Sequence, residues 1–219
     1  MKLAPRALFF VASLLVALIG IVSFVNTPTG FAALSWSTKA SMPTARGSLG
    51  VGVVAGKLYA VGGFNNGSGA LTTVESYDPV ADTWSTVAPM STPRNATAVG
   101  VVNGLLYAVG GDTDAGGSGY LASMEAYDPV SNTWSPRAPM PTPRDALSVG
   151  VVNGKLYALG GQSPNRVFHS TVEAYDPVTN SWISRAPMPT ARFFFGVGVV
   201  NNILYVVGGH SGSGFLSTV

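Results

Sequence analysis

Short apolar segments alternate with polar turns along most of the chain, and the pattern recurs about every 50 residues. Within one repeat, residues 96–102 form an apolar run, Asn103-Gly104 follows, and residues 105–109 form a second run. Asn-Gly between two apolar runs predicts a tight β-hairpin, because both turn positions need a positive φ. We therefore expect each repeat to begin with two antiparallel strands.

The rest of the repeat predicts two further strands. Residues 121–127 are expected to form a strand that ends at Asp128-Pro129, since proline cannot donate a hydrogen bond within a central ladder. Residues 133–138 are expected to form the fourth strand, which ends at the proline-rich residues 139–143. Because no segment between residues 34 and 219 shows a helical apolar period, the sequence predicts an all-β fold.

Several sequence markers keep the same spacing as this apolar pattern. The segment Tyr-x-(Val/Leu)-Gly-Gly occurs four times, beginning at Tyr59, Tyr107, Tyr157 and Tyr205. A Glu-x-Tyr-Asp-Pro block begins at Glu75, Glu125 and Glu173. Tryptophans and arginines recur in phase with these blocks, at Trp36, Trp84, Trp134, Trp182, Arg46, Arg94, Arg144 and Arg192. Four short strands in a period near 50 residues are typical of a propeller blade.

These markers resemble the kelch family, of an exported and bacterial type, over nearly all of residues 34–219. The resemblance implies a β-propeller of four-stranded antiparallel blades. It does not imply one function, since kelch domains serve both as partner-binding platforms and as enzymes.

The markers also place the blades along the chain. We expect three complete kelch-like blades and a partial fourth, over residues 47–88, 95–138, 145–186 and 193–219. Kelch-like propellers commonly close with an N-terminal strand, and residues 35–42 are the candidate for it. Because kelch domains usually have six or seven blades, a fragment of a larger propeller is favoured over a four-bladed ring.

Residues 1–32 have the pattern of an export leader. Lys2 and Arg6 precede an apolar run from Ala7 to Val25, and a small-x-small site follows at Gly30-Phe31-Ala32. This order is that of a cleaved signal peptide, while a run of this length could also remain as a signal anchor. In both cases the positive charge before the run predicts export of the repeats. We expect a periplasmic, cell-surface or secreted protein that contacts the membrane only through this leader.

Composition excludes several kinds of chemistry. The chain has no cysteine, which excludes disulfides, thiol catalysis and thiolate metal sites. Its net charge is only +2, so nucleic acid is not an expected partner. His169 and His210 follow their double glycines at different distances, so we predict no metal and no cofactor. No nucleophile elbow is present, and no catalytic residue is assigned.

Residues that recur in each repeat are interpreted as structural. A site that discriminates a ligand normally breaks the repeat, whereas a residue that each blade needs keeps it. The arginines and glutamates are expected to pair with each other or to bind loop backbone, and the tryptophans to pack between blades. This set comprises Arg46, Arg94, Arg144, Arg192, Glu75, Glu125, Glu173, Trp84, Trp134 and Trp182.

The loops differ between repeats, and ligand contacts are expected there. The alternating strand direction places the loops between the second and third strands on the same face as the loops between blades. Aromatic, amide and charged side chains in these loops suit a protein or a glycan. The candidate ligand-binding residues are Phe64, Asn66, Asp112, Asp114, Tyr120, Asp145, Arg166, Phe168, His169, Phe193, Phe194 and His210.

The sequence favours a noncatalytic binding or scaffold module for an extracytoplasmic protein or carbohydrate. The alternative is an enzyme that acts on sugars, since kelch-like propellers include exported sialic-acid mutarotases. Such catalysis needs an ionisable pair that breaks the repeat, and none is evident among Asp112, Asp114, Asp145, Arg166, His169 and His210. A purely structural role at the cell surface is a third class.

Overall fold

The structure is a computed structural model that describes residues 36–114 and 119–219, and the leader expected over residues 1–32 lies outside the described residues. Ala40–Val219 forms one compact unit. Helical structure within the described ranges is limited to the 3-10 turn η1 (Pro164–Arg166). No helix in these ranges is long and apolar enough to cross a membrane.

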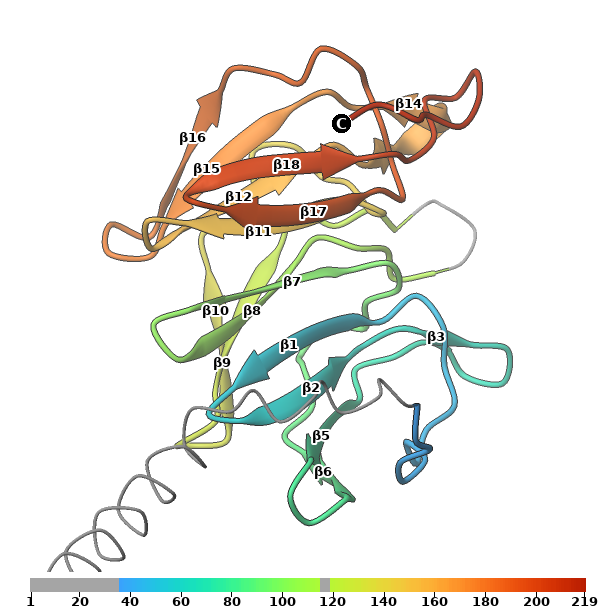
Figure 1. The fold of residues 1–219 in the computed structure, drawn as a ribbon, viewed down its shortest axis with the longest axis vertical. Coiled ribbons are helices and arrows are strands. Elements are labelled where there is room, and N and C mark those ends of the chain that lie inside the picture. The colour runs from blue at the N-terminus through green and yellow to red at the C-terminus, as the bar shows by residue number, and fades with distance from the viewer. Residues whose placement is uncertain (1–35, 115–118) are drawn as a thin grey trace, which may run out of the picture. The chain divides into compact units, whose positions relative to one another are not determined.

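Three four-stranded antiparallel sheets follow one another along the chain (Figure 1). The first consists of β1 (Gly50–Val54), β2 (Lys57–Val61), β5 (Val74–Asp78) and β6 (Thr83–Val87). The second consists of β7 (Ala98–Val102), β8 (Leu105–Val109), β9 (Met124–Asp128) and β10 (Thr133–Arg137). The third consists of β11 (Ser148–Val152), β12 (Lys155–Leu159), β15 (Val172–Asp176) and β16 (Ser181–Arg185). We refer to the strands of each blade, in chain order, as strands a, b, c and d.

A fourth sheet contains β17 (Gly196–Val200) and β18 (Ile203–Val207), which correspond to strands a and b. Two short ribbons extend the b-to-c loops, formed by β3 (Phe64–Asn65) with β4 (Gly69–Ala70) and by β13 (Gln162–Ser163) with β14 (Val167–Phe168). The arrangement confirms the predicted all-β fold with three complete blades and part of a fourth.

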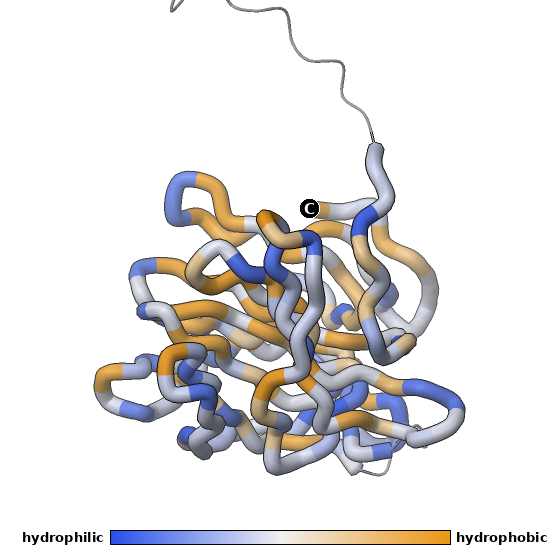
Figure 2. The backbone as a smooth tube through the Cα atoms, turned by 90° about the horizontal axis from the view of Figure 1, so that it is seen from below, coloured by the Kyte–Doolittle hydropathy of each residue, from blue (hydrophilic) through white to orange (hydrophobic). Residues whose placement is uncertain are grey.

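The a-to-b hairpins have the turn geometry that the sequence predicts. Asn103 and Gly104 both have positive φ, at 51° and 79°, between the paired residues Val102 and Leu105. Hydrophobic residues lie mainly along the strands and hydrophilic residues at the loops (Figure 2). Each turn therefore brings two apolar strands together and leaves its polar residues at the rim.

Neighbouring blades pack through a glycine of strand a. A Cβ atom at Gly100 would lie 2.2 Å from Cδ2 of Leu156, and one at Gly150 would lie 2.1 Å from Cδ2 of Leu204. Because the glycine has no side chain, a leucine from the next blade fills the space above it. At Gly198, in the fourth sheet, an added Cβ would meet nothing within 4 Å.

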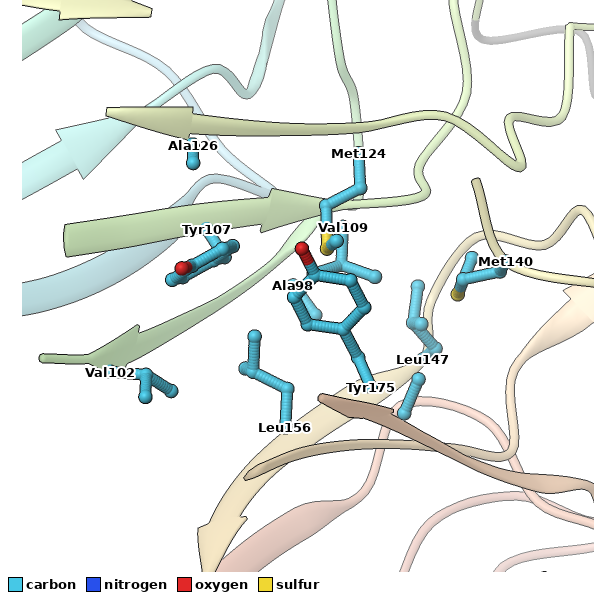
Figure 3. Close-up of a cluster of buried hydrophobic side chains, with 11 residues drawn as sticks. Ala98, Val102, Tyr107, Val109, Met124, Ala126, Met140, Leu147, Leu156 and Tyr175 are labelled. Atoms are coloured by element: carbon cyan, nitrogen blue, oxygen red, sulfur yellow. The ribbon is translucent and has the colours of Figure 1, made fainter. Parts of the chain in front are cut away.

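Tyrosine pairs complete the contact between blades. Tyr107 of β8 lies against Tyr175 of β15, with ring centroids 5.8 Å apart, and Tyr59 lies against Tyr127 at 5.7 Å. Figure 3 shows the ring of Tyr175, from the third blade, beside Val109 of the second, in a cluster that also contains Leu156 and Met124. The core is thus shared between adjacent blades rather than enclosed within each one.

The described residues of the segment 35–42 form no strand, and Ala40 contacts the first blade. The Ala40 N–H donates to Asp82 Oδ1 at 2.9 Å, and the Trp84 indole N–H donates to the Ala40 carbonyl oxygen at 2.9 Å. Trp134 makes the equivalent bond to the Ala88 carbonyl oxygen. Ala40 therefore takes the place of a residue that follows strand d, and pairing of 35–42 with the fourth sheet stays a prediction.

Candidate functional site

Buried ion pairs occupy three of the four repeated arginine positions. The distances are 2.8 Å for Arg46–Glu75, 3.0 Å for Arg94–Glu125 and 2.9 Å for Arg144–Glu173. Each arginine lies in the loop that enters a blade, and each glutamate lies on strand c of that blade. The pairs join the entry loop to the blade beneath the loop face.

The second blade shows how such a pair is bonded. Arg94 Nη1 also donates to the carbonyl oxygens of Gly110 and Ser123, at 2.8 Å and 2.9 Å. Burial lowers the pKa of Arg94, and Glu125 opposes this effect. Although burial acts to raise it, hydrogen bonds from Ser91 and from Arg94 hold the pKa of Glu125 below its ordinary value. Both charged groups are therefore hydrogen-bonded within the second blade and its entry loop.

The repeated tryptophans join consecutive blades. Trp84, Trp134 and Trp182 each donate the indole N–H to a carbonyl oxygen that precedes their own blade, at 2.9, 2.9 and 2.8 Å. Each ring also packs on the strand c tyrosine of its own blade, at 5.1 to 5.2 Å between centroids. Each tryptophan thus contacts both its own blade and the chain that precedes it, and the structural role of the repeated tryptophans stays a prediction.

One pair of residues recurs at the same place on the loop face of each blade. The residue after each repeated arginine forms an antiparallel bridge with the residue after each double glycine. In the second blade, for example, Asn95 and Asp112 exchange two backbone hydrogen bonds of 2.8 Å. The four pairs, which we call the bridge row, are Gly47–Phe64, Asn95–Asp112, Asp145–Gln162 and Phe193–His210. The backbone of the row repeats while its side chains differ, as expected of a site that discriminates a ligand.

A chain of backbone hydrogen bonds fixes the bridge row from blade to blade. The N–H groups of Ala96, Ala146 and Phe194 each donate to the equivalent carbonyl oxygen of the preceding blade, at 3.0 to 3.1 Å. The first acceptor is Ser48, and all four residues have positive φ, between 48° and 52°. Such a backbone is costly for a residue as large as Phe194, and its recurrence in all four blades marks it as part of the repeat. A cavity of about 170 Å³ lies beside these residues.

An acidic group lies where the second and third blades meet on this face. Asp112 is 1% exposed and Asp145 is 6% exposed, and Oδ1 of Asp145 has no hydrogen-bond partner among the described residues. Burial raises the pKa of Asp145 to about 6, and the negative charge of Asp112 acts in the same direction. Burial also raises the pKa of Tyr120, with further contributions from these two carboxylates. The group therefore includes a carboxyl that changes protonation near neutral pH.

An aromatic group lies beside it, on the third and fourth blades. Phe168 stacks on Phe193 with ring centroids 4.7 Å apart and an interplanar angle of 11°. His210 contacts Phe193 at 5.2 Å and Phe215 at 5.1 Å, in both cases edge to face. A cavity of about 250 Å³ is lined by Phe193, Phe194, His210 and Phe215. Phe194 is 64% exposed and Phe215 is 91% exposed, so two large ring faces are open to a ligand.

The structure brings together only part of the predicted ligand-binding set. Asp112, Tyr120 and Asp145 meet in the acidic group, with Asp114 donating its backbone N–H to Asp112 Oδ1 at 3.0 Å. The aromatic group gathers Phe168, Phe193, Phe194 and His210.

The remaining candidates lie elsewhere. Phe64 belongs to the bridge row of the first blade, while Asn66 lies at the tip of the β3–β4 ribbon and Arg166 lies exposed in η1. His169 lies within hydrogen-bond distance of the Ser163 hydroxyl, at 2.9 Å, and burial lowers its pKa. Among the described residues no hydrogen bond or ring contact joins these four to either group.

Three residues of the site were absent from the predicted set. Phe215 lies in a glycine- and serine-rich loop, and only the folded loop brings its ring onto His210. Asn95 and Gln162 belong to the bridge row, and Oδ1 of Asn95 is buried without a partner in the described part of the chain. An alignment of the four repeats would have found Asn95 and Gln162, because Asn95 follows a repeated arginine and Gln162 follows a double glycine. In the ranges 36–114 and 119–219 no group of three or more metal-ligating side chains is close enough to hold a metal ion.

Comparisons with known proteins agree with this architecture. No curated protein matches the chain. Among solved structures, that of YjhT matches with a TM-score of 0.70 at 18% sequence identity, over 80% of this chain and 61% of the YjhT chain. At that identity the likeness concerns the fold alone. The model of the Kelch motif matches residues 45–91, 93–141, 143–189 and 191–219, so the chain belongs to the kelch-repeat family.

Proposed function

We propose that this chain is a noncatalytic module that binds a carbohydrate through its loop face. A kelch-repeat propeller supports a binding or scaffold role in general, and equally a propeller enzyme. The observation that carries the proposal is the pair of exposed rings, Phe194 and Phe215, around a cavity of about 250 Å³. This volume is below the 300 Å³ or so of most drug-sized pockets, and it suits one ring or one side chain rather than a large ligand.

The neighbouring acidic group supports a sugar as the ligand. The Phe194 N–H donates to the carbonyl oxygen of Ala146, which follows Asp145, so the two groups are adjacent on the backbone. A pyranose has apolar faces that stack on aromatic rings and hydroxyl groups that donate to carboxylate and amide oxygens. Asp145 Oδ1 and Asn95 Oδ1 are buried acceptors without a partner in the described residues, and they make the surroundings of the exposed rings polar. A protein ligand that inserts an aromatic or polar side chain is the second class that this face suits.

Export is part of the same proposal. The leader pattern of residues 1–32 would place the loop face outside the cytoplasm, where glycans of cell surfaces are available. The ligand is therefore proposed to be an extracytoplasmic carbohydrate, free or attached to a protein.

A glycan array, followed by calorimetry on the bound sugars, tests the function. Phe194→Ala and Phe215→Ala should each remove binding and leave the melting temperature unchanged, because both rings are largely exposed. Val130→Ala is the matched control, since Val130 is 94% exposed in the c-to-d turn and away from both groups. Sugar binding that survives both phenylalanine substitutions would refute the proposal.

One observation favours a sugar-modifying enzyme as the second candidate. Asp145 is buried, has a pKa raised to about 6 and lies close to Asp112, as a general acid or base would. If the site is catalytic, Asp145→Asn should abolish the anomeric interconversion of the bound sugar while sugar binding persists. NMR spectroscopy of the sugar measures the interconversion. If it is a binding site only, the unsubstituted protein should show no turnover.

A further inference from the structure

A histidine replaces a leucine at one repeated position of the b-to-c loops. The residue at this position donates its backbone N–H to the carbonyl oxygen of the second glycine of the double glycine, at 2.8 to 2.9 Å in all four blades. The four residues are Leu71, Leu121, His169 and Leu216. The backbone is therefore the same in each blade, while only the third blade carries an ionisable side chain there. A residue that breaks the repeat in this way is expected at a site rather than in the architecture.

The ring of His169 lies against a hydroxyl group. Its Nε2 atom is 2.9 Å from Oγ of Ser163, and both residues are partly exposed. Ser163 ends β13, and the partner strand β14 leads directly to His169. The His169 N–H donates to the Gly161 carbonyl oxygen, and the Arg192 N–H donates to the His169 carbonyl oxygen at 3.1 Å. These bonds fix the histidine on the repeating backbone, with the serine within reach of its ring.

The surroundings of His169 favour its neutral form. Burial and the positive charge of Arg144 lower the pKa of His169, while the negative charge of Glu173 opposes them. The imidazole is therefore uncharged at neutral pH. With its proton on Nδ1, the ring presents a lone pair at Nε2 to the Ser163 hydroxyl. A hydroxyl within hydrogen-bond reach of a neutral histidine is the arrangement that activates a serine as a nucleophile.

We propose that Ser163 is an acylation site, which accepts a small acyl group from an activated carboxylic ester. His169 Nε2 takes the proton of the Ser163 hydroxyl as Oγ bonds to the carbonyl carbon of the ester. The bond from that carbon to the alkoxide or phenolate oxygen then breaks, and the leaving oxygen takes the proton from His169. The products are an acyl ester of Ser163 and a free alcohol or phenol. One acyl group is transferred to each chain, so the reaction modifies the binding module without turnover.

The acyl group has an apolar neighbour on the same ribbon. Val167 lies directly opposite Ser163 in the β13–β14 pair, so both side chains project from one face of the ribbon. Val167 is 50% exposed, which leaves its methyl groups open to a short aliphatic chain on the serine. This site is outside the acidic and aromatic groups of the loop face. Acylation of Ser163 is therefore independent of the carbohydrate proposed for that face.

The probe is p-nitrophenyl acetate, incubated with the full chain and followed by mass spectrometry of the tryptic peptides. The peptide of residues 156–166 contains one serine and no lysine, so fragmentation assigns an acetyl group to Ser163. The peptide of residues 193–219 is the internal control, because Ser211 follows the bridge residue there as Ser163 does in the third blade, and Leu216 replaces the histidine. We expect Ser163 to be acetylated at least about a hundredfold faster than Ser211, the lower end of what a general base contributes.

One variant and a pH profile separate activation of the serine from its accessibility. His169→Leu introduces the leucine of the other blades, so the melting temperature should be retained while acetylation of Ser163 falls to the rate at Ser211. In the unsubstituted protein the rate should rise with pH and level off, with a midpoint below the ordinary histidine pKa of about 6.5. Equal rates at Ser163 and Ser211, an unchanged rate in His169→Leu, or a rate that keeps rising with hydroxide through neutral pH would each overturn the proposal.

Discussion

The Arg94 guanidinium lies 3.0 Å from the Glu125 carboxylate, and neither side chain is more than 5% exposed. The arginine enters from the loop before the second blade, and the glutamate lies on β9 within it. The pair therefore fastens the loop face to the sheet that supports it. Its counterparts in the first and third blades do the same, so the attachment of each of these entry loops to its own blade depends on buried charge.

Removing one member of this pair should be strongly destabilising. Arg94→Ala leaves Glu125 buried without its cation, which typically costs about 3 to 5 kcal/mol of unfolding free energy. Chemical denaturation followed by tryptophan fluorescence measures the loss. Arg166→Ala is the matched control, because Arg166 is exposed and should change stability by less than about 0.5 kcal/mol. Similar midpoints for the two variants would contradict the structural role of Arg94.

Asp145 should make stability decrease as the pH rises. Its pKa is raised to about 6 by burial and by Asp112, so the folded state holds the proton more tightly than the unfolded chain does. The stabilisation is complete below the ordinary aspartate pKa of about 4 and is lost as the pH rises through about 6. Because an asparagine side chain is uncharged at every pH, Asp145→Asn should be more stable than the unsubstituted protein at pH 8.

Thermal unfolding at pH 4 and at pH 8 measures this difference. The gain from Asp145→Asn at pH 8 should shrink or vanish at pH 4, where the aspartate itself is protonated. An equal gain at both pH values would show that Asp145 does not titrate in this range.

The loss of stability on substituting a strand a glycine should depend on whether a side chain of the next blade packs against that glycine. Gly100→Ala places a methyl group 2.2 Å from the buried Leu156, and such overpacking typically costs about 1 to 3 kcal/mol. Gly198→Ala meets nothing within 4 Å and should be neutral or slightly stabilising, since alanine restricts the unfolded chain. Urea denaturation of both variants checks the contrast, and an equal loss of stability would argue against packing between blades.

The leader gives a prediction that concerns processing. Cleavage after Gly30-Phe31-Ala32 would produce a mature chain that begins at Ala33. Intact-mass measurement of the exported protein shows whether its first residue is Ala33. Retention of Met1 in a membrane fraction would instead favour a signal anchor.

The architecture could be predicted from the sequence because its signals recur in phase. Asn103-Gly104 predicts one hairpin, and the repetition of its neighbours at the same spacing predicts the others. Because Arg94 and Glu125 recur in the same phase, the sequence also predicts a structural role for them, in contrast to the residues of the variable loops. Repetition thus turns weak local signals into a reliable assignment of strands and blades.

The composition of the site was less predictable, because loop conformation depends on contacts distant in the sequence. Phe168 meets Phe193 only because the third and fourth blades are adjacent. Phe215 reaches His210 through a loop whose glycines permit many conformations, so no local pattern marks it. Arg166 is a candidate by its charge, but η1 leaves it exposed and away from both groups.

The hydrogen bonds that run from Ser48 through Ala96 and Ala146 to Phe194 involve only main-chain atoms. Their geometry does not depend on which side chains stand at the adjoining bridge positions. A blade can therefore exchange Asn95 and Asp112 for another pair while its neighbours keep their spacing. The backbone of the loop face can thus stay constant while the side chains that it presents differ from one blade to the next.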